Sequence, residues 1–206
     1  MNKTNSPLWQ QPPEPPDSDG GVFIGLGSNL PHRGQSPEAV MRTAIAACRD
    51  AGLALGAVSS LYRSKAEGGP MQPDYLNAVI EVATTLAPGD LLALLHDIEA
   101  RMGRERLVRY GPRTLDLDLL DMRGAVLPDP ARWQAETARE SAPLFLVLPH
   151  PRLHLRRFAL APLLEIAPDW RHPVLGVQGA DLLASLPEQG IARLAIPLLD
   201  ASNLAP

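Results

Sequence analysis

The amino-acid sequence predicts an α+β fold of the ferredoxin-like type, a βαββαβ core whose antiparallel sheet is packed by helices. Stretches with strand-like and helix-like spacing of apolar residues alternate in that order between residues 22 and 122. The remaining chain adds a helical stretch and shorter elements, so we expect extra strand and helix elements at the C-terminus. A chain of 206 residues, of which 45% are hydrophobic, suits one domain with a substantial core.

The first strand and the first helix have recognisable start and stop signals. Residues 22–26 are mostly apolar and end in a Gly-Ser-Asn turn, which predicts a buried strand. The next stretch has helical spacing, with Ser36 as the N-cap and Pro37 at the first helical position. Gly52 is expected to end this helix.

The middle of the core is predicted to hold two strands and a second helix. Residues 54–64 form the second strand, and a loop rich in glycine and proline follows over 65–74. Apolar residues then occupy alternate positions in 75–86, which predicts a third strand. An amphipathic helix is expected from Pro88 to Gly103.

The last core strand comes after an arginine-rich stretch. Residues 114–122, TLDLDLLDM, alternate apolar and acidic side chains and predict a fourth strand. Residues 123–153 show little regular pattern and contain Trp133, to which the sequence assigns no purpose. A short helix is expected over 156–168, and marginal elements end the chain.

Composition and the N-terminal stretch indicate a cytoplasmic protein. The first 20 residues are rich in proline and polar side chains, so we expect a disordered tail before a single domain over 21–206. This tail lacks the apolar stretch of a signal peptide, and no apolar run reaches the roughly 18 residues of a membrane span. Cys48, the only cysteine, falls in the apolar row of a predicted helix, where we expect a buried, unreactive thiol.

Positive charge is concentrated in one place, although the net charge is −4, which argues against general nucleic-acid binding. Five arginines fall within thirteen residues: Arg101, Arg104, Arg106, Arg109 and Arg113. Arginine binds phosphate oxygens through paired hydrogen bonds, and the flanking Gly103 and Gly111 would let the stretch close over a triphosphate. The alternative is a surface loop paired with Glu99 and Glu105.

Two acidic side chains of the fourth strand predict a metal site. Asp116 and Asp118 share one strand face, with Cα atoms roughly 6.5–7 Å apart, while the neighbouring leucines point into the core. Two such carboxylates repel each other unless cations lie between them, and hard oxygen ligands favour Mg²⁺. Paired ions about 3.5–4 Å apart would suit this spacing. The alternative is a half-exposed strand with acidic outer residues, and Asp121, of opposite parity, is interpreted as a strand-end residue.

Further polar and aromatic side chains suggest a site for a flat heterocycle. Tyr75 and Asn77 share a strand face, where an amide can match the edge of a pteridine or purine ring and an aromatic ring can stack on it. A polar outer face is the alternative. His150 is followed by a second basic cluster that includes Arg156, for which a solvated surface is the alternative, and Phe158 equally suits a plain core position.

The Gly-x-Gly pair at Gly25 and Gly27 resembles a dinucleotide-binding turn, but that interpretation is rejected. Leu30 occupies the place of the third glycine, and no acidic residue follows at the end of a parallel strand. We expect the turn to serve strand-to-helix packing, with Asn29 as a local hydrogen-bonding residue.

Six stretches together resemble one family, the 6-hydroxymethyl-7,8-dihydropterin pyrophosphokinases of folate biosynthesis. They are FIGLGSNL, SSLYRS, QPDYLNAV, GPRTLDLDLL, LPHPRL and RRFALAPLLEIAP, which occur in the family's order within residues 22–170. The resemblance implies transfer of the β,γ-diphosphate of ATP to the hydroxymethyl group of the pterin, with release of AMP and with two Mg²⁺ ions. It implies ATP and the pterin as partners, no nucleic acid, no membrane and a monomer.

The resemblance also assigns roles to residues at matching positions. Asp116 and Asp118 match metal-binding carboxylates, and Asn77 matches the residue that recognises the pterin edge. Tyr75 and Phe158 match the aromatic pair that stacks on the ring. The catalytic set would be Arg104, Arg113, Asp116 and Asp118, and the ATP contacts would be His96, Glu99, Arg104, Arg113, His150 and Arg156. Arg106, Arg109 and the insertion over 124–149 have no firm match.

Two other classes of protein compete with this assignment. A palm-like nucleotidyl transferase also places carboxylates on a ferredoxin-like sheet, but the acidic net charge and the small size argue against an enzyme that binds a template. An inactive ligand-binding module on the same fold is disfavoured because Asn77, Arg113 and both carboxylates are retained.

Overall fold

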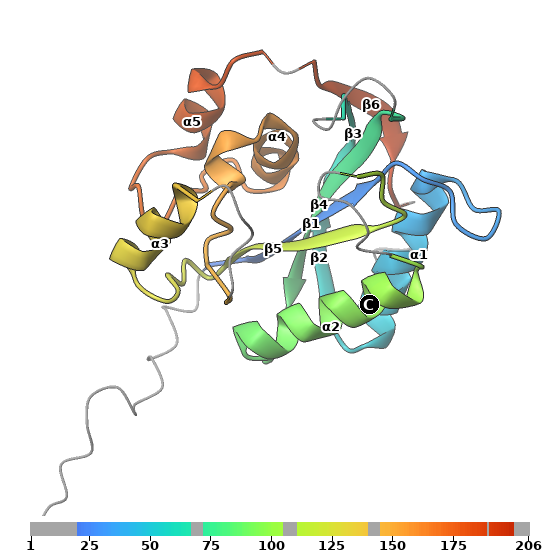
Figure 1. Cartoon of the computed structure of the whole chain (residues 1–206), viewed down its shortest axis with the longest axis horizontal. Coiled ribbons are helices and arrows are strands. Elements are labelled where there is room, and N and C mark those ends of the chain that lie inside the picture. Colours follow the sequence, from blue (N-terminus) through green and yellow to red (C-terminus); the bar gives the residue numbers. More distant parts are fainter. Residues whose placement is uncertain (1–19, 67–71, 105–110, 140–144, 189, 200–206) are drawn as a thin grey trace, which may run out of the picture.

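The computed structural model describes residues 20–66, 72–104, 111–139, 145–188 and 190–199. These residues form a six-stranded antiparallel sheet in the order β5-β1-β4-β3-β6, with β2 also paired to β4 (Figure 1). The predicted N-terminal tail lies outside the described residues, apart from Gly20.

The predicted βαββαβ core is confirmed. In chain order its elements are β1 (Val22–Ser28), α1 (Pro37–Asp50), β2 (Ala54–Val58), β3 (Ser60–Ser64), β4 (Tyr75–Ala83), α2 (Pro88–Arg101) and β5 (Asp116–Met122). Strand β1 lies between β4 and β5 and is antiparallel to both, which is the arrangement that the alternation of strands and helices predicts.

The boundaries of the elements follow local chemistry. The N-cap prediction for α1 is confirmed, since Ser36 Oγ accepts a hydrogen bond from the backbone N–H of Ala39, and Gly52 follows the helix with a φ of 89°. The strand predicted over 54–64 is divided at Ser59 into β2 and β3. At this break the side chain of Ser59 takes the place of a backbone acceptor, since its Oγ accepts a hydrogen bond from the backbone N–H of Val79 on β4 at 2.9 Å.

Side chains alternate between the two faces of the sheet, and a separate core forms on each. Helices α1 and α2 cover one face, where the leucines next to the acidic pair are buried as predicted; Leu115, Leu117 and Leu119 belong to this core. Cys48 of α1 is buried there as predicted, and burial raises its pKa to about 11, which disfavours the reactive thiolate. On the other face Phe23 packs with helix α4 (Arg157–Ile166).

Extra C-terminal elements are present, as predicted. They are η2 (Leu153–Leu155), α4, α5 (Gly179–Ser185) and β6 (Ala192–Pro197), and β6 extends the sheet by pairing with β3. Helix α3 (Pro130–Thr137) was not predicted, although its signals are in the sequence. Asp129 caps it by accepting from the backbone N–H of Arg132 at 3.0 Å, and Pro130 occupies its first position.

Trp133 anchors α3 to the chain segment that carries His150. Its side chain is 1% exposed, and its Nε1 donates to the backbone oxygen of Pro149 at 2.7 Å. Its ring lies 5.4 Å from that of His154 and 4.9 Å from that of His172, measured between ring centroids. Trp133 therefore fixes the insertion to the segment before His150 and to two histidine rings of the C-terminal part.

We predict that His172 makes the fold sensitive to acid. Burial, and then the neighbouring His154, lower the pKa of His172 to about 4 from an ordinary value of 6.5. The folded state then binds this proton less readily than the unfolded chain. The contribution of neutral His172 to the free energy of unfolding is therefore complete above pH 6.5. It is lost as the pH falls toward 4, and the loss is about 3 kcal/mol at most.

The measurement is urea unfolding of wild type and of His172→Asn at about pH 7 and about pH 4.5. The asparagine oxygen can replace Nδ1, which accepts from the backbone N–H groups of Val174 and Leu175. The variant should lose less free energy of unfolding between the two pH values than wild type. An equal loss in both proteins would contradict the prediction.

Candidate active site

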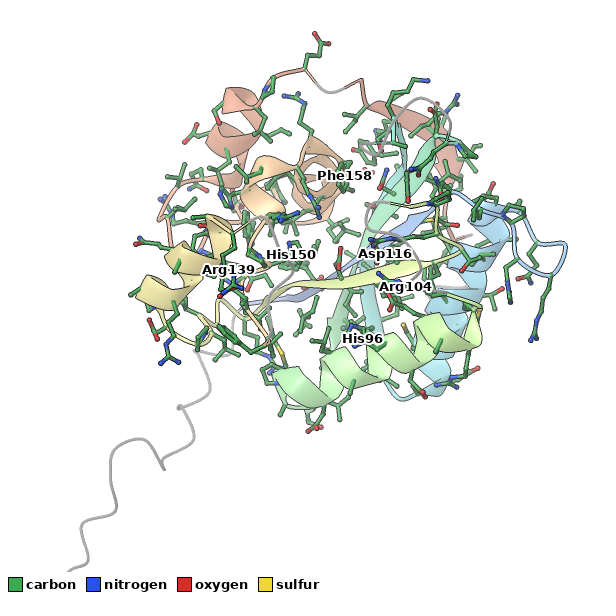
Figure 2. The ribbon with its side chains drawn as sticks, viewed as in Figure 1. His96, Arg104, Asp116, Arg139, His150 and Phe158 are labelled. Atoms are coloured by element: carbon green, nitrogen blue, oxygen red, sulfur yellow. The ribbon has the colours of Figure 1, made fainter. Side chains whose placement is uncertain are left out.

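One cavity of about 420 Å³ opens on the sheet face opposite α1, bounded by β1, β4 and β5. Figure 2 shows His96, Arg104, Asp116, His150 and Phe158 gathered around it from separate parts of the chain. All predicted site residues except Glu99 line the cavity: Tyr75, Asn77, His96, Arg104, Arg113, Asp116, Asp118, His150, Arg156 and Phe158. The fold therefore brings the predicted residues together.

Glycines of β1 form the floor of the cavity. Gly25 pairs with Asp118 of β5, and Gly27 lies between Asp116 of β5 and Asn77 of β4. A Cβ atom at Gly27 would lie 3.6 Å from Asp116 Cβ and 3.9 Å from Asn77 Oδ1. These glycines lie within a strand, so the expectation that they serve strand-to-helix packing is wrong. Gly27 leaves room above the sheet between an amide and a carboxylate.

The amide and aromatic groups lie at one end of the cavity. Asn77 is buried, and its Nδ2 donates to Ser64 Oγ at 2.9 Å and more weakly to the backbone oxygen of Tyr62 at 3.4 Å. These bonds to β3 fix the orientation of the amide. Tyr75 is held by its hydroxyl, which donates to the backbone oxygen of Gly111 at 3.0 Å. The predicted heterocycle site thus has rigid support.

The acidic pair lies next to this end, on one strand face as predicted. Asp116 is bound by Arg113 and by Arg104, whose Nη2 lies 2.6 Å from Asp116 Oδ1. Burial, and then the negative charge of Asp118, raise the pKa of Asp116, and the two arginines only partly offset this. The pair is therefore a place where additional positive charge is favourable.

Asp118 remains the more acidic member of the pair. Burial alone would raise its pKa, but the positive groups around it, His150, Arg156, Arg104 and Arg113, lower it overall. Burial lowers the pKa of His150, and the negative charge of Asp118 partly offsets this.

The acidic pair fits a magnesium site. Both carboxylates are half-buried and supply hard oxygen ligands from one face. Among the described residues, no group of three or more His, Cys, Asp or Glu side chains is arranged to hold a metal ion. Magnesium at Asp116 and Asp118 would thus take its other ligands from phosphate and water, as it commonly does.

His150 and Arg156 line the cavity beside Asp118. The backbone N–H of His150 donates to Leu120 of the edge strand at 2.7 Å, and its Nδ1 accepts from the backbone N–H of Arg152 at 3.2 Å. A neutral His150 therefore carries its proton on Nε2, as a hydrogen-bond donor. Arg157 does not line the cavity but donates to the backbone oxygens of Leu183 and Leu186.

Glu99 has a different position from the other predicted residues. It is buried on α2, where it accepts a hydrogen bond from the backbone N–H of Leu117 at 2.7 Å and pairs with Arg104. Leu117 lies between the two carboxylates, so Glu99 holds both the strand and an arginine of the site. The alternative interpretation was a surface loop whose arginines pair with Glu99. The pair between Arg104 and Glu99 is present, but it is buried rather than on the surface. Residues 105–110, with Glu105, Arg106 and Arg109, lie outside the described residues.

Asn29 is a supporting residue whose reach the sequence did not reveal. Its Oδ1 accepts from the backbone N–H of Arg113 at 2.7 Å, and its Nδ2 donates to the backbone oxygen of Pro73 at 3.1 Å. These partners are 84 and 44 residues away, so the interpretation as a local hydrogen-bonding residue is wrong. Asn29 joins the chain before β4 to the chain before β5.

Asp121 lies at the end of β5, as predicted, but its side chain is not on the sheet face that simple alternation along the strand predicts. The register between β1 and β5 shifts between Phe23 and Ile24, so one extra residue of β5 turns Asp121 back toward the face of Asp118. It is buried there and accepts from Trp170 Nε1 at 2.7 Å. Asp121 therefore supports the second core rather than lining the cavity.

Comparison with known proteins identifies the family. Residues 23–168 match the family described as 7,8-dihydro-6-hydroxymethylpterin-pyrophosphokinase. The chain belongs to this family. The family predicted from the sequence, and with it the class of pyrophosphokinase, is confirmed.

Two bacterial relatives of the chain carry the name 2-amino-4-hydroxy-6-hydroxymethyldihydropteridine pyrophosphokinase. The protein from Synechocystis sp. is 40% identical over 166 residues, which cover 80% of this chain and 75% of the relative. The protein from Pseudomonas aeruginosa is 41% identical over 174 residues, which cover 84% of this chain and 96% of the relative.

A solved structure supports the fold of this pyrophosphokinase. The structure of wild-type Plasmodium falciparum HPPK-DHPS with pteroate matches with a TM-score of 0.55 and 14% identity. The match covers 80% of this chain and 44% of that one, so the chain spans less than half the length of the Plasmodium protein. At this identity the likeness shows the fold alone.

We predict that Gly27→Val blocks the cavity without unfolding the sheet. Valine suits a strand, and a Cβ here makes only ordinary contacts, so the melting temperature should change little. Its two methyl groups would occupy the space between Asp116 and Asn77, and pyrophosphokinase activity should fall about 100-fold or more.

The matched control is Gly89→Ala on α2, where a Cβ meets nothing within 4 Å and activity should be retained. Activity assays and thermal melts of both variants check the prediction. Activity of Gly27→Val near the wild-type level would show that the floor of the cavity is not where the ligands bind.

Proposed function

We propose that this enzyme transfers the β,γ-diphosphate of ATP to the hydroxymethyl group of 6-hydroxymethyl-7,8-dihydropterin, a step of folate biosynthesis. The observation that supports this best is the pairing at Gly27, which brings Asn77 and Asp116 to opposite sides of one glycine in one cavity. The residue proposed to bind the ring and the acidic pair thus lie on the two strands that flank β1.

The pterin is proposed to bind at the end formed by Asn77, Tyr75 and Phe158. The orientation of the Asn77 amide is fixed by Ser64, so the amide presents a set pattern to the edge of the ring. Tyr75 and Phe158 also line the cavity and supply aromatic faces for stacking. The hydroxymethyl group would then point toward the acidic pair.

The phosphates are proposed to lie between the acidic pair and the basic side chains. Arg104, Arg113, Arg156 and the Nε2–H of a neutral His150 would donate to phosphate oxygens, and His96 would line the nucleotide side. A contact of Glu99 with ATP stays a prediction, since Glu99 is buried behind Arg104. Two Mg²⁺ ions held by Asp116 and Asp118 would neutralise the charge of the polyphosphate.

The reaction needs no covalent enzyme group. The hydroxymethyl oxygen of the pterin forms a bond to the β-phosphorus of ATP, and the bond from the β-phosphorus to the oxygen of the α-phosphate breaks. The hydroxyl proton is released, AMP leaves and the pterin keeps the diphosphate. The side chains of the cavity align the two substrates and stabilise the charge on the phosphates.

The proposed setting is a single-domain monomer over residues 21–206 in the cytoplasm, where ATP is available. None of the helices in the part of the chain that the structure describes is long and apolar enough to cross a membrane.

The test of the function is incubation of the full chain with ATP, Mg²⁺ and 6-hydroxymethyl-7,8-dihydropterin, followed by mass spectrometry. We expect equal amounts of AMP and pterin diphosphate, formed only when all three are present. ADP with a pterin monophosphate would contradict the proposed transfer. Pterin-independent release of diphosphate would favour a nucleotidyl transferase, and ordered binding without AMP would favour an inactive binding module.

We predict that Asp118→Asn lowers turnover by about three orders of magnitude or more while the fold is retained. The change removes the more acidic carboxylate of the pair but keeps its shape, so thermal melts should differ little from wild type. EDTA should abolish the activity of wild type, and added Mg²⁺ should restore it.

Asp97→Asn is the matched control for this change, because Asp97 is exposed on α2 and pairs only with Arg101 among the described residues. Its turnover should equal that of wild type. Near-normal turnover of Asp118→Asn, or full activity in EDTA, would refute the metal-binding role.

A further inference from the structure

Outside the cavity, Glu165 joins helix α4 to strands β3 and β6. Its Oε1 accepts hydrogen bonds from Ser60 Oγ at 2.8 Å and from Arg193 Nη2 at 2.7 Å, and its Oε2 accepts from the hydroxyl of Tyr62 at 2.9 Å. Ser60 and Tyr62 belong to β3, and Arg193 belongs to β6. One carboxylate in the last turn of α4 is therefore held by three donors from the edge of the sheet.

These bonds keep Glu165 ionised. Burial alone would raise its pKa, but hydrogen bonds from Ser60 and Tyr62, with Arg193, lower it. Burial and Glu165 raise the pKa of Tyr62 to about 12, so its hydroxyl remains a donor. The side chain of Arg193 is 62% exposed, and solvent weakens its ion pair, so the two hydroxyl groups of β3 provide most of the hold.

Glu165 and its donors Ser60, Tyr62 and Arg193 are called the clamp below. Helix α4 connects this clamp to the wall of the cavity. Phe158 and Glu165 are seven residues apart on α4, which is two helical turns, so both lie on the same face of the helix. That distance is about 10 Å along the axis, and a tilt of roughly 5° at Glu165 would move Phe158 by about 1 Å. Figure 1 shows α4 lying over the sheet near β3 and β4, on the face opposite α2.

Strand β3 also supports Asn77, which lines the same cavity as Phe158. Asn77 donates to Ser64 Oγ and to the backbone oxygen of Tyr62, both on β3. Tyr62 thus contacts the amide through its backbone and Glu165 through its hydroxyl. Strand β3 thus supports both Asn77 and, through Glu165, the helix that carries Phe158.

We propose that Glu165 is a positioning residue for the ring-binding end of the cavity. By bonding α4 to the strand that orients Asn77, it sets the spacing between the Phe158 ring and that amide. The proposal rests on the proposed function for the identity of the ligand as the pterin. Leu160 and Leu163 are buried on α4, so the helix stays attached when the clamp is removed.

The test is Glu165→Gln in the full chain, with affinities measured by calorimetry. For the pterin, in the presence of Mg²⁺ and a non-hydrolysable ATP analogue, the dissociation constant should rise about tenfold, which corresponds to about 1.4 kcal/mol. The affinity for the analogue with Mg²⁺ alone should fall less than that for the pterin, because Arg104, Arg113 and the acidic pair are not carried by α4. In kinetics, KM for the pterin should rise more than kcat falls.

The matched control is Glu38→Gln on α1. Glu38 is a half-buried glutamate of similar exposure that pairs with Arg42, and neither side chain lines the cavity. It should change neither affinity. A second measurement is hydrogen exchange of the amides of Ala159 and Leu160, which donate to the backbone oxygen of Arg156 in the first turn of α4. Exchange should be faster in Glu165→Gln than in wild type.

The proposal is overturned if Glu165→Gln lowers the melting temperature but leaves the pterin affinity unchanged, or weakens both ligands equally. If that variant does not fold, Tyr62→Phe is used instead, because it removes only one donor to Glu165. We then expect the affinity for the pterin alone to fall about threefold, on the order of half the free-energy change of Glu165→Gln. The proposal is also overturned if Tyr62→Phe shows no selective loss of affinity for the pterin. Absence of AMP formation by wild type would refute the proposed function instead, and hydrogen exchange would still test the clamp.

Discussion

The pairing of β1 with its two neighbours is the constraint on which the structure depends. It places Gly27 between Asn77 on one strand and Asp116 on the other, and it sends the alternate apolar side chains to the core under α1 and α2. Because side chains alternate with a period of two, a slip of one residue in β5 would turn both carboxylates into that core. The same register therefore determines both the stability of the sheet and the composition of the cavity.

Much of this arrangement could be predicted because it depends on local patterns. Periodicity identified the core elements, caps such as Ser36 marked their ends, and the spacing of Asp116 and Asp118 fixed their common face. A ferredoxin-like strand order then brings the strand of Asn77 and that of the acidic pair to either side of β1. Their meeting in one cavity follows from topology together with strand alternation.

The supporting contacts could not be predicted, because they join residues far apart in the sequence. Asn29 reaches two distant backbone segments, and Glu165 bonds residues about one hundred positions away on β3. The shift in register at Phe23 has no composition signal, so the true direction of Asp121 was not predicted. Burial of Glu99 behind Arg104 likewise emerges only from the packing of α2 on β5.

The last strand has a consequence for how much of the chain forms a stable unit. The family match ends at residue 168, yet β6 covers the outer edge of β3 with antiparallel pairing at Tyr62 and Arg63. A fragment that stopped at the family boundary would leave this row of backbone N–H and C=O groups without partners. Such an open edge is a template for sheet growth between copies, so the C-terminal strand also acts as a barrier against aggregation.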